Sequence, residues 1–185
     1  MGEVLRWLTG KTIEWKLNSD IQEAAGPLQG GGLKGLKGGA ESAIHAMKDI
    51  FESESSDGVI LVDASNAFNS LNRQAVLHNI QYICPPFANV LINTYRIPSR
   101  LLVMGGREIQ FREGTTQGDN LAMSFYALGT NLILNKMKNS VSGVKQVWLA
   151  DNATGAGRLN ELKQWWDSVI SEGSKHGYYV NEQKS

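Results

Sequence analysis

The chain has 185 residues, enough for one domain with a hydrophobic core, and 42% of them are hydrophobic, which is typical of a soluble folded protein. No apolar run reaches the roughly 18 residues that a membrane-spanning helix needs, so we expect no membrane partner. Charged residues interrupt the apolar residues near the N-terminus, which argues against a secretory signal peptide. Cys84 is the only cysteine, which excludes an internal disulfide and a cysteine-ligated zinc site.

These features predict a protein of the nucleus or cytoplasm with no disulfide-linked partner. The 18 basic and 18 acidic residues cancel, which counts against strong nucleic-acid binding by this chain alone, because phosphate contacts dominate such binding. A locally basic groove and scattered surface charge both remain open. The candidates for the groove are Lys34, Lys37, Arg96, Arg100, Arg107 and Arg112.

The sequence before residue 40 predicts no regular helix or strand, and the first such elements are expected after it. Residues 1–25 are weakly patterned, and residues 26–39 hold seven glycines and a proline, which predicts a loop. The GGGLKG run at 30–35 formally fits a dinucleotide-binding fingerprint, but no strand precedes it, so we do not expect that function. A helix is expected from Ala40, and the apolar run 59–62 predicts a buried central strand that ends at Asp63.

The second half predicts a regular series of elements. Helices are expected over 71–83 and 87–96, a hairpin over 99–112 with Gly105-Gly106 as its turn, and a polar loop over 114–120. A long helix should cover 121–138. The strand expected over 144–150 ends at Asp151, residues 153–157 should form a turn, and an amphipathic helix should cover 158–175. A last strand is expected to begin at Tyr178.

Two carboxylates therefore stand at the ends of short apolar strands. If the strands of Asp63 and Asp151 are neighbours, the carboxylates face one spot, and two carboxylates held close repel unless a divalent cation lies between them. Mg²⁺ fits such a place, because it binds through one or two carboxylates together with substrate phosphates. The alternative is that both are ordinary turn aspartates that never meet, and the spacing alone does not decide between these.

Four segments in order resemble the motifs of reverse transcriptases. DASNAF at 63–68 is similar to polymerase motif A, and EGTTQGD at 113–119 is similar to motif B, a Gln-Gly turn that opens a long helix. LADNA at 149–153 is similar to motif C, usually aromatic-Ala-Asp-Asp, and Gly177 followed by Lys184 is similar to motif D. The resemblance runs from about residue 26 to the end and is closest to non-LTR and related retroelement enzymes.

This resemblance implies a role for each matching position. Asp63 and Asp151 match the two metal-binding aspartates, which implies Mg²⁺ or Mn²⁺ as cofactor, and Asn152 stands at the third metal position. Ala64 matches the residue whose backbone carbonyl often joins them. Phe68 matches the aromatic residue under the nucleotide sugar, although a plain core phenylalanine stays open. The remaining matches are Gln117 and Gly118, at the turn that lines the nucleotide pocket, and Lys184, at the lysine proposed to protonate the leaving pyrophosphate.

The implied fold is α+β: the palm of a right-hand polymerase, with an antiparallel sheet and helices packed on one face. Residues 1–39 would be partial fingers with a glycine-rich loop, residues 40–185 the palm, and the thumb would be absent. The implied function is RNA-directed DNA synthesis, with an RNA template, a DNA primer and deoxynucleoside triphosphates as partners.

Departures from the family pattern leave an alternative open. Asn152 replaces the second aspartate of motif C and carries no charge, so metal affinity should fall. Leu149 replaces an aromatic residue, and Asn120 replaces a proline, which should loosen the turn of motif B. The alternative is a catalytically inactive palm remnant that acts at most as a nucleic-acid-binding or structural module. A metal-dependent phosphohydrolase is a third hypothesis, but the sequence offers no candidate base to activate water.

Overall fold

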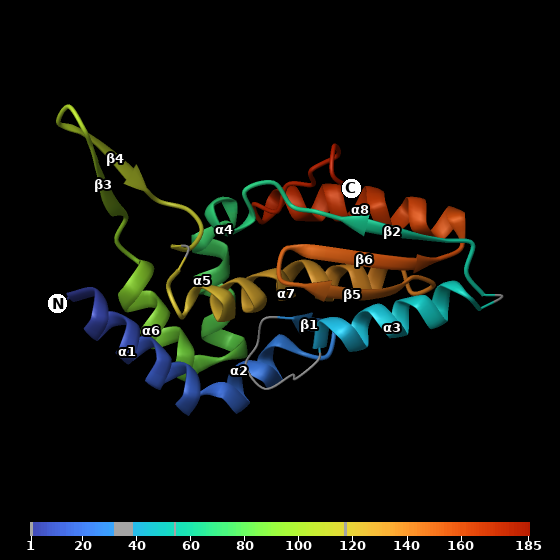
Figure 1. Ribbon diagram of the computed structural model, residues 1–185, viewed down its shortest axis with the longest axis horizontal. Coiled ribbons are helices and arrows are strands. Elements are labelled where there is room, and N and C mark those ends of the chain that lie inside the picture. Colours follow the sequence, from blue (N-terminus) through green and yellow to red (C-terminus); the bar gives the residue numbers. More distant parts are fainter. Residues whose placement is uncertain (1, 32–38, 54, 117) are drawn as a thin grey trace.

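A mixed four-stranded sheet forms one half of the protein in the computed structural model, which describes residues 2–31, 39–53, 55–116 and 118–185 (Figure 1). Its strand order is β1–β5–β6–β2. The bounds are β1 Gln29–Gly31, β2 Gly58–Val62, β5 Lys145–Leu149 and β6 Asn152–Gly157. Strand β6 pairs antiparallel with both β2 and β5, whereas β1 runs parallel to β5. The α+β class is confirmed, but the sheet is not wholly antiparallel.

The hairpin of β5 and β6 corrects the prediction of a turn over 153–157. Those residues are all alanine, threonine or glycine, so they carry no apolar pattern that would predict a strand. Their small size suits the packing, because a side chain on Gly155 would meet the Trp165 ring of the neighbouring helix. The strand prediction for 144–150 is confirmed by β5.

Strand β2 lies at the edge of the sheet, which corrects its prediction as a central strand. Its side chains alternate between the two faces, and both faces are apolar: Val62 is buried, whereas Leu61 is 66% exposed. An edge strand whose two faces are both partly covered has the same apolar sequence pattern as a central strand. The apolar run alone therefore does not tell which of the two it is.

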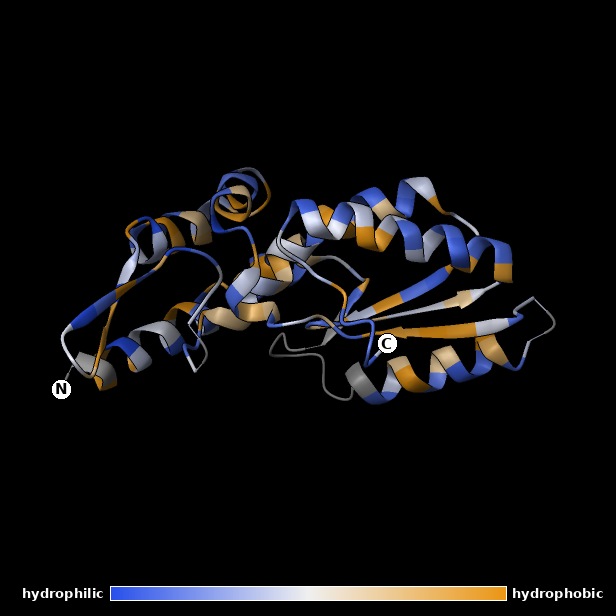
Figure 2. Ribbon diagram, turned by 90° about the horizontal axis from the view of Figure 1, so that it is seen from above, coloured by the Kyte–Doolittle hydropathy of each residue, from blue (hydrophilic) through white to orange (hydrophobic). Residues whose placement is uncertain are grey.

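Helices cover both faces of the sheet, not one as expected. Helices α7 (Ala122–Ser140) and α8 (Leu159–Lys175) pack on one face, and α3 (Gly39–Phe51) packs on the other (Figure 2). Met47 of α3 shares a shallow apolar pocket with Val59 and Leu61 of β2. Because β2 is apolar on both sides, each face needs a cover, and the prediction of helices on one face was wrong for this reason. The predictions of these three helices themselves are confirmed.

The other half of the protein is helical, and part of it was not predicted. Residues 2–25 form α1 (Gly2–Lys16) and α2 (Asn18–Ala25). Most apolar side chains of α1 are exposed, which explains the weak pattern. The predicted helices are confirmed as α5 (Arg73–Ile83) and α6 (Pro85–Tyr95), with the short α4 (Ala67–Ser70) before them. The proline pair both stops α5 and begins α6, where proline suits the first turn. Cys84, between them, is buried.

A predicted hairpin projects from this helical half (Figure 1). Its strands are β3 (Ser99–Val103) and β4 (Arg107–Phe111), which pair antiparallel. Gly105 and Gly106 both have positive φ, so the predicted turn is confirmed. No helix in the described part of the chain is long and apolar enough to cross a membrane.

Candidate active site

The two strand-end aspartates come to neighbouring positions of the sheet. Val62, which precedes Asp63, pairs with Ala153 of β6, and Leu149 pairs with Asn152 across the β5–β6 turn that holds Asp151. Asp63 therefore leaves β2 beside Asn152, one strand away from the turn of Asp151. Strand β6 lies between the strand that ends at Asp63 and the strand that ends before Asp151, so these two strands are not direct neighbours. That the two carboxylates face one spot stays a prediction.

The turn that carries Asp151 is held by a residue that the sequence did not single out. Ala150 has a positive φ of 56°, and its N–H donates to Oε1 of Gln29 on β1 at 3.2 Å. Gln29 is fully buried, and its Nε2 donates to Oγ1 of Thr130 on α7 at 2.9 Å. One side chain thus links the β5–β6 turn to the long helix. No signal in the sequence pointed to Gln29, because it lies in the glycine-rich segment predicted as loop.

The C-terminal segment lies beside Asp63. Asn181 N–H donates to the carbonyl oxygen of Asp63 at 2.8 Å, and Ser65 N–H donates to the carbonyl oxygen of Tyr179 at 2.7 Å. The strand expected from Tyr178 does not form, and in its place a single antiparallel β-bridge joins Ala64 and Val180. This pairing places Lys184 near the candidate site.

The charged groups around Asp63 come from that segment. Nζ of Lys184 lies 3.9 Å from Oδ2 of Asp63, and Nδ2 of Asn181 donates to the same oxygen at 3.4 Å. The Asp63 side chain is 28% exposed and the Lys184 side chain 71% exposed, so water screens this ion pair strongly. The structure therefore places Lys184 next to Asp63, and its role toward a pyrophosphate stays a prediction.

Phe68 lies on α4, just after Asp63 and Ala64 in the chain. Its side chain is half-buried, and its ring centroid lies 4.6 Å from that of Tyr126 on α7. Ala64 is buried. Phe68 is thus a half-buried residue that packs against the core.

The loop that precedes α7 is bonded to α4. Thr115 N–H donates to the carbonyl oxygen of Phe68 at 2.6 Å, and Gly114 N–H donates to that of Leu71 at 2.8 Å. Gly118 has a positive φ of 84° in this loop. Gln117 lies outside the described residues. The motif B loop therefore lies next to the helix that follows Asp63.

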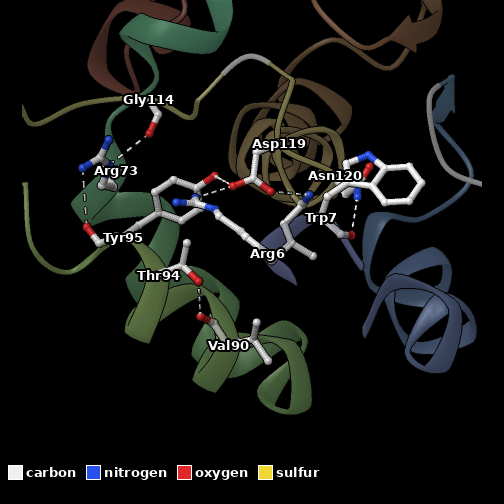
Figure 3. A network of polar contacts seen from close by, with 10 residues as sticks. Arg6, Trp7, Arg73, Val90, Thr94, Tyr95, Gly114, Asp119 and Asn120 are labelled. Carbon is white, nitrogen blue, oxygen red and sulfur yellow. Dashed lines mark hydrogen bonds and ion pairs between the residues drawn. The ribbon is translucent and has the colours of Figure 1, made fainter. Parts of the chain in front are cut away.

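Arg73 holds this loop through hydrogen bonds to its backbone, and no pattern in the sequence pointed to this residue. Its side chain is buried, and the guanidinium donates to the carbonyl oxygen of Gly114 at 3.0 Å (Figure 3). It also donates to the carbonyl oxygen of Glu113 at 3.0 Å. Desolvation lowers the pKa of Arg73. The Glu113 carboxylate in turn accepts from the Arg73 backbone N–H at 2.8 Å. Arg73 therefore connects α5 to the loop through these hydrogen bonds.

Asp119 and Asn120 tie the end of the loop to α1 and α6. Arg6 of α1 forms an ion pair with Asp119, which also accepts from the Tyr95 hydroxyl at 3.4 Å (Figure 3). Burial first, and Asp119 second, raise the pKa of Tyr95 to about 12. Asn120 Nδ2 donates to the carbonyl oxygen of Trp7 at 2.7 Å. The asparagine that was expected to loosen the turn instead anchors it to α1.

Two tyrosines lie under the aspartates. The Tyr178 hydroxyl donates to the carbonyl oxygen of Asp151 at 2.9 Å. Burial raises the pKa of both Tyr178 and Tyr126, and the negative charges of Asp151 and Asp63 raise both further. The charges of both carboxylates therefore raise the pKa of the same two phenols.

The donors at these strand ends fit a hard divalent cation. Within the described residues, no group of three or more His, Cys, Asp or Glu side chains could hold a metal ion. A cation here would bind the carboxylates of Asp63 and Asp151 and take its remaining oxygens from Asn152, backbone carbonyls, water or substrate phosphates. That pattern suits Mg²⁺ or Mn²⁺, which keep water and phosphate ligands, and not a zinc site closed by protein side chains.

Solved structures of telomerase share this fold. The chain aligns over 95% of its length with telomerase from Candida albicans in complex with the TWJ fragment of telomeric RNA, at a TM-score of 0.64 and 11% identity, and covers 34% of that chain. Telomerase from Candida tropicalis in the same kind of complex aligns over 94%, at a TM-score of 0.65 and 13% identity, and is covered to 32%.

The apo telomerase from Candida tropicalis, truncated from its C-terminal domain, aligns over 94% of this chain at a TM-score of 0.63 and 15% identity. No protein-family model matches the sequence, and no curated protein matches it significantly. The chain has a reverse-transcriptase-like fold and spans about a third of the length of the telomerase chains that it matches. At these identities the likeness shows the fold alone.

Proposed function

We propose that this chain is the palm region of a retroelement-type reverse transcriptase, which adds deoxynucleotides to a DNA primer on an RNA template. One observation carries the proposal: Asp63 follows β2, and the turn of Asp151 leads into β6, the strand that pairs with β2, in a reverse-transcriptase-like fold. Polar groups at the ends of sheet strands are a common setting for catalytic sites.

The residues then have distinct tasks. Asp63 and Asp151 hold the divalent cation, and Asn152 contributes an uncharged oxygen. A bound cation would supply charge stabilisation to the attacking and leaving oxygens of a phosphoryl transfer. Lys184 stands beside Asp63, where it can give a proton to a departing pyrophosphate oxygen.

The nucleotide pocket is formed by the motif A helix and the motif B loop. The exposed part of Phe68, backed by Tyr126, would lie under the sugar, where a ring leaves no room for a 2′-hydroxyl. Gly118 has no side chain and a positive φ, so its backbone can come close to the base pair. Gln117 completes the loop in this proposal.

An RNA partner is supported by the solved structures, since two of the similar telomerases are complexes with telomeric RNA. The chain's own charge adds a second argument. Exposed arginines gather at and beside the β3–β4 hairpin, although the whole chain is neutral, and these are Arg96, Arg100, Arg107 and Arg112. Such a cluster can contact phosphates of a template or primer. A nuclear or cytoplasmic location belongs to the same proposal.

A second candidate is an inactive module that binds cation and nucleic acid without catalysis. The observation that favours it is Asn152, which leaves two carboxylates where the family pattern has three. A weaker cation site would lower the rate of phosphoryl transfer even if template and primer still bind.

The test combines cation binding with single-nucleotide addition. Mn²⁺ titration by calorimetry should show a site in the wild type that Asp63→Asn and Asp151→Asn both lose. Asp167→Asn is the matched control, because Asp167 is an exposed residue of α8 paired with Lys163. Addition of one deoxynucleotide to a DNA primer on an RNA template should occur in the wild type and in Asp167→Asn. It should be lost in Asp63→Asn and Asp151→Asn.

The outcomes separate the candidates. Cation and template-primer binding without nucleotide addition would favour the inactive module. Mn²⁺ affinity that is equal in the wild type and both site variants would contradict the proposed site.

A further inference from the structure

Tyr126 carries a buried hydroxyl that has no hydrogen-bond partner. Its side chain on α7 is fully buried, and Oη is the only buried side-chain polar atom without a partner among the described residues. The two other buried tyrosines differ, because Tyr178 donates to Asp151 and Tyr95 donates to Asp119. An unpaired buried hydroxyl destabilises a fold, and phenylalanine would fill the same space without that cost.

The ring of Tyr126 contacts a residue of the candidate site. The Tyr126 ring lies against Phe68, five residues after Asp63. Burial raises the pKa of Tyr126 well above its ordinary value, and the charges of Asp151 and Asp63 raise it further. The phenol therefore stays protonated, and its buried hydroxyl can still donate a hydrogen bond.

We propose that Tyr126 is a positioning residue of the cation site, whose hydroxyl takes its missing partner from a water molecule that enters with a hydrated divalent cation. The inference rests on the proposed function, because it requires a cation at Asp63 and Asp151. It fits the chemistry of Mg²⁺ and Mn²⁺ sites, since such ions dehydrate reluctantly and keep several waters. Tyr126 acts through that water and does not ligate the ion itself.

The proposal predicts effects of opposite sign in the free and the loaded protein. Tyr126→Phe removes an unpaired hydroxyl, so the melting temperature without cation should rise by about 2–4 °C. The same change removes a donor from the loaded site, so Mn²⁺ affinity should fall about five- to tenfold. A hydroxyl with a purely structural role would not give this reversal.

The control is Tyr95→Phe, which removes the hydroxyl of a buried tyrosine that already has an acceptor. It should lower the melting temperature without cation and leave Mn²⁺ affinity unchanged. Tyr126→Phe combined with Asp151→Asn supplies the coupling test, because loss of the site should abolish any effect of the tyrosine on cation affinity.

Melting curves with and without Mn²⁺, and calorimetric Mn²⁺ titrations, are measured on all variants. Unchanged Mn²⁺ affinity in Tyr126→Phe, or a lower melting temperature of that variant without cation, would overturn the proposal for Tyr126. If Asp151→Asn alone still weakens Mn²⁺ binding, the proposed function survives that result. If the wild type binds no Mn²⁺, or if Asp151→Asn has no effect, the proposed function fails and the role of Tyr126 fails with it.

Discussion

The ammonium group of Lys184 lies 3.9 Å from the carboxylate of Asp63, although one residue follows the edge strand and the other lies near the C-terminus. Pairing of the C-terminal segment with residues 63–65 brings them together. Asp63 thus has a positive partner before any cation binds. A divalent cation must compete with that partner for the same oxygen.

This relationship predicts that Lys184→Met strengthens divalent cation binding. Removal of a neighbouring positive charge should raise Mn²⁺ affinity by about two- to fivefold, within the range of about 0.2–1 kcal/mol of an exposed ion pair. The gain should shrink in high salt. Lys175→Met is the control, because Lys175 is also exposed but pairs with Glu172 on α8. Weaker Mn²⁺ binding in Lys184→Met would show that the lysine supports the site and does not compete.

Asn152→Asp should raise Mn²⁺ affinity about tenfold. A third carboxylate adds attraction for the cation, and desolvation and repulsion among the carboxylates reduce the net gain to about 1–2 kcal/mol. The same change should lower the melting temperature without cation, because three carboxylates then crowd one strand end. Calorimetry and melting curves measure both effects.

The control for that variant is Asn160→Asp, which adds the same charge at an exposed position early in α8. It should leave cation affinity unchanged. If Asn152→Asp also leaves it unchanged, or if it raises the melting temperature of the cation-free protein, Asn152 does not face the site.

Gly114→Ala should destabilise the fold more than Gly106→Ala. Both glycines have positive φ, which costs a side chain about 1–2 kcal/mol. A side chain on Gly114 would also collide with the backbone of Phe68 and Asn69, whereas one on Gly106 meets open space. Overpacking adds about 1–3 kcal/mol for Gly114 alone. Equal losses in chemical unfolding would mean that the motif B loop does not pack on α4 as the structure has it.

Arg73→Lys should cost about 2–4 kcal/mol of unfolding free energy. Lysine keeps the charge but cannot reproduce a planar fork that donates to several carbonyl oxygens in a buried place. Arg100→Lys is the control, since Arg100 is exposed on the hairpin. Urea unfolding of both variants gives the comparison, and a small loss for Arg73→Lys would show that the loop is held by other contacts.

The sequence was sufficient where local pattern decides structure. The apolar runs before Asp63 and Asp151 predicted strands, and the helical periodicity of residues 158–175 predicted α8. Pattern was insufficient where packing decides. The small residues of β6 form a strand because they fit beneath Trp165, and α1 shows no clear apolar stripe because Trp15 and Leu5 are exposed.

The site shows the same division. Asp63, Asp151 and Lys184 could be named as candidates from their motifs because each motif is short and local. Gln29 and Tyr126 could not, since each acts on residues far away in the sequence and has no distinctive neighbours of its own. Their roles depend on how α7 packs under the β5–β6 turn.

The central claim is that Asp63 and Asp151 share a divalent cation. Crystals grown with Mn²⁺ and measured for anomalous scattering test it most directly. We expect an anomalous peak between the carboxylate oxygens of the two aspartates, and no peak there in Asp151→Asn. A fully bound Mn²⁺ elsewhere in the protein, with these two carboxylates free of metal, would contradict the account.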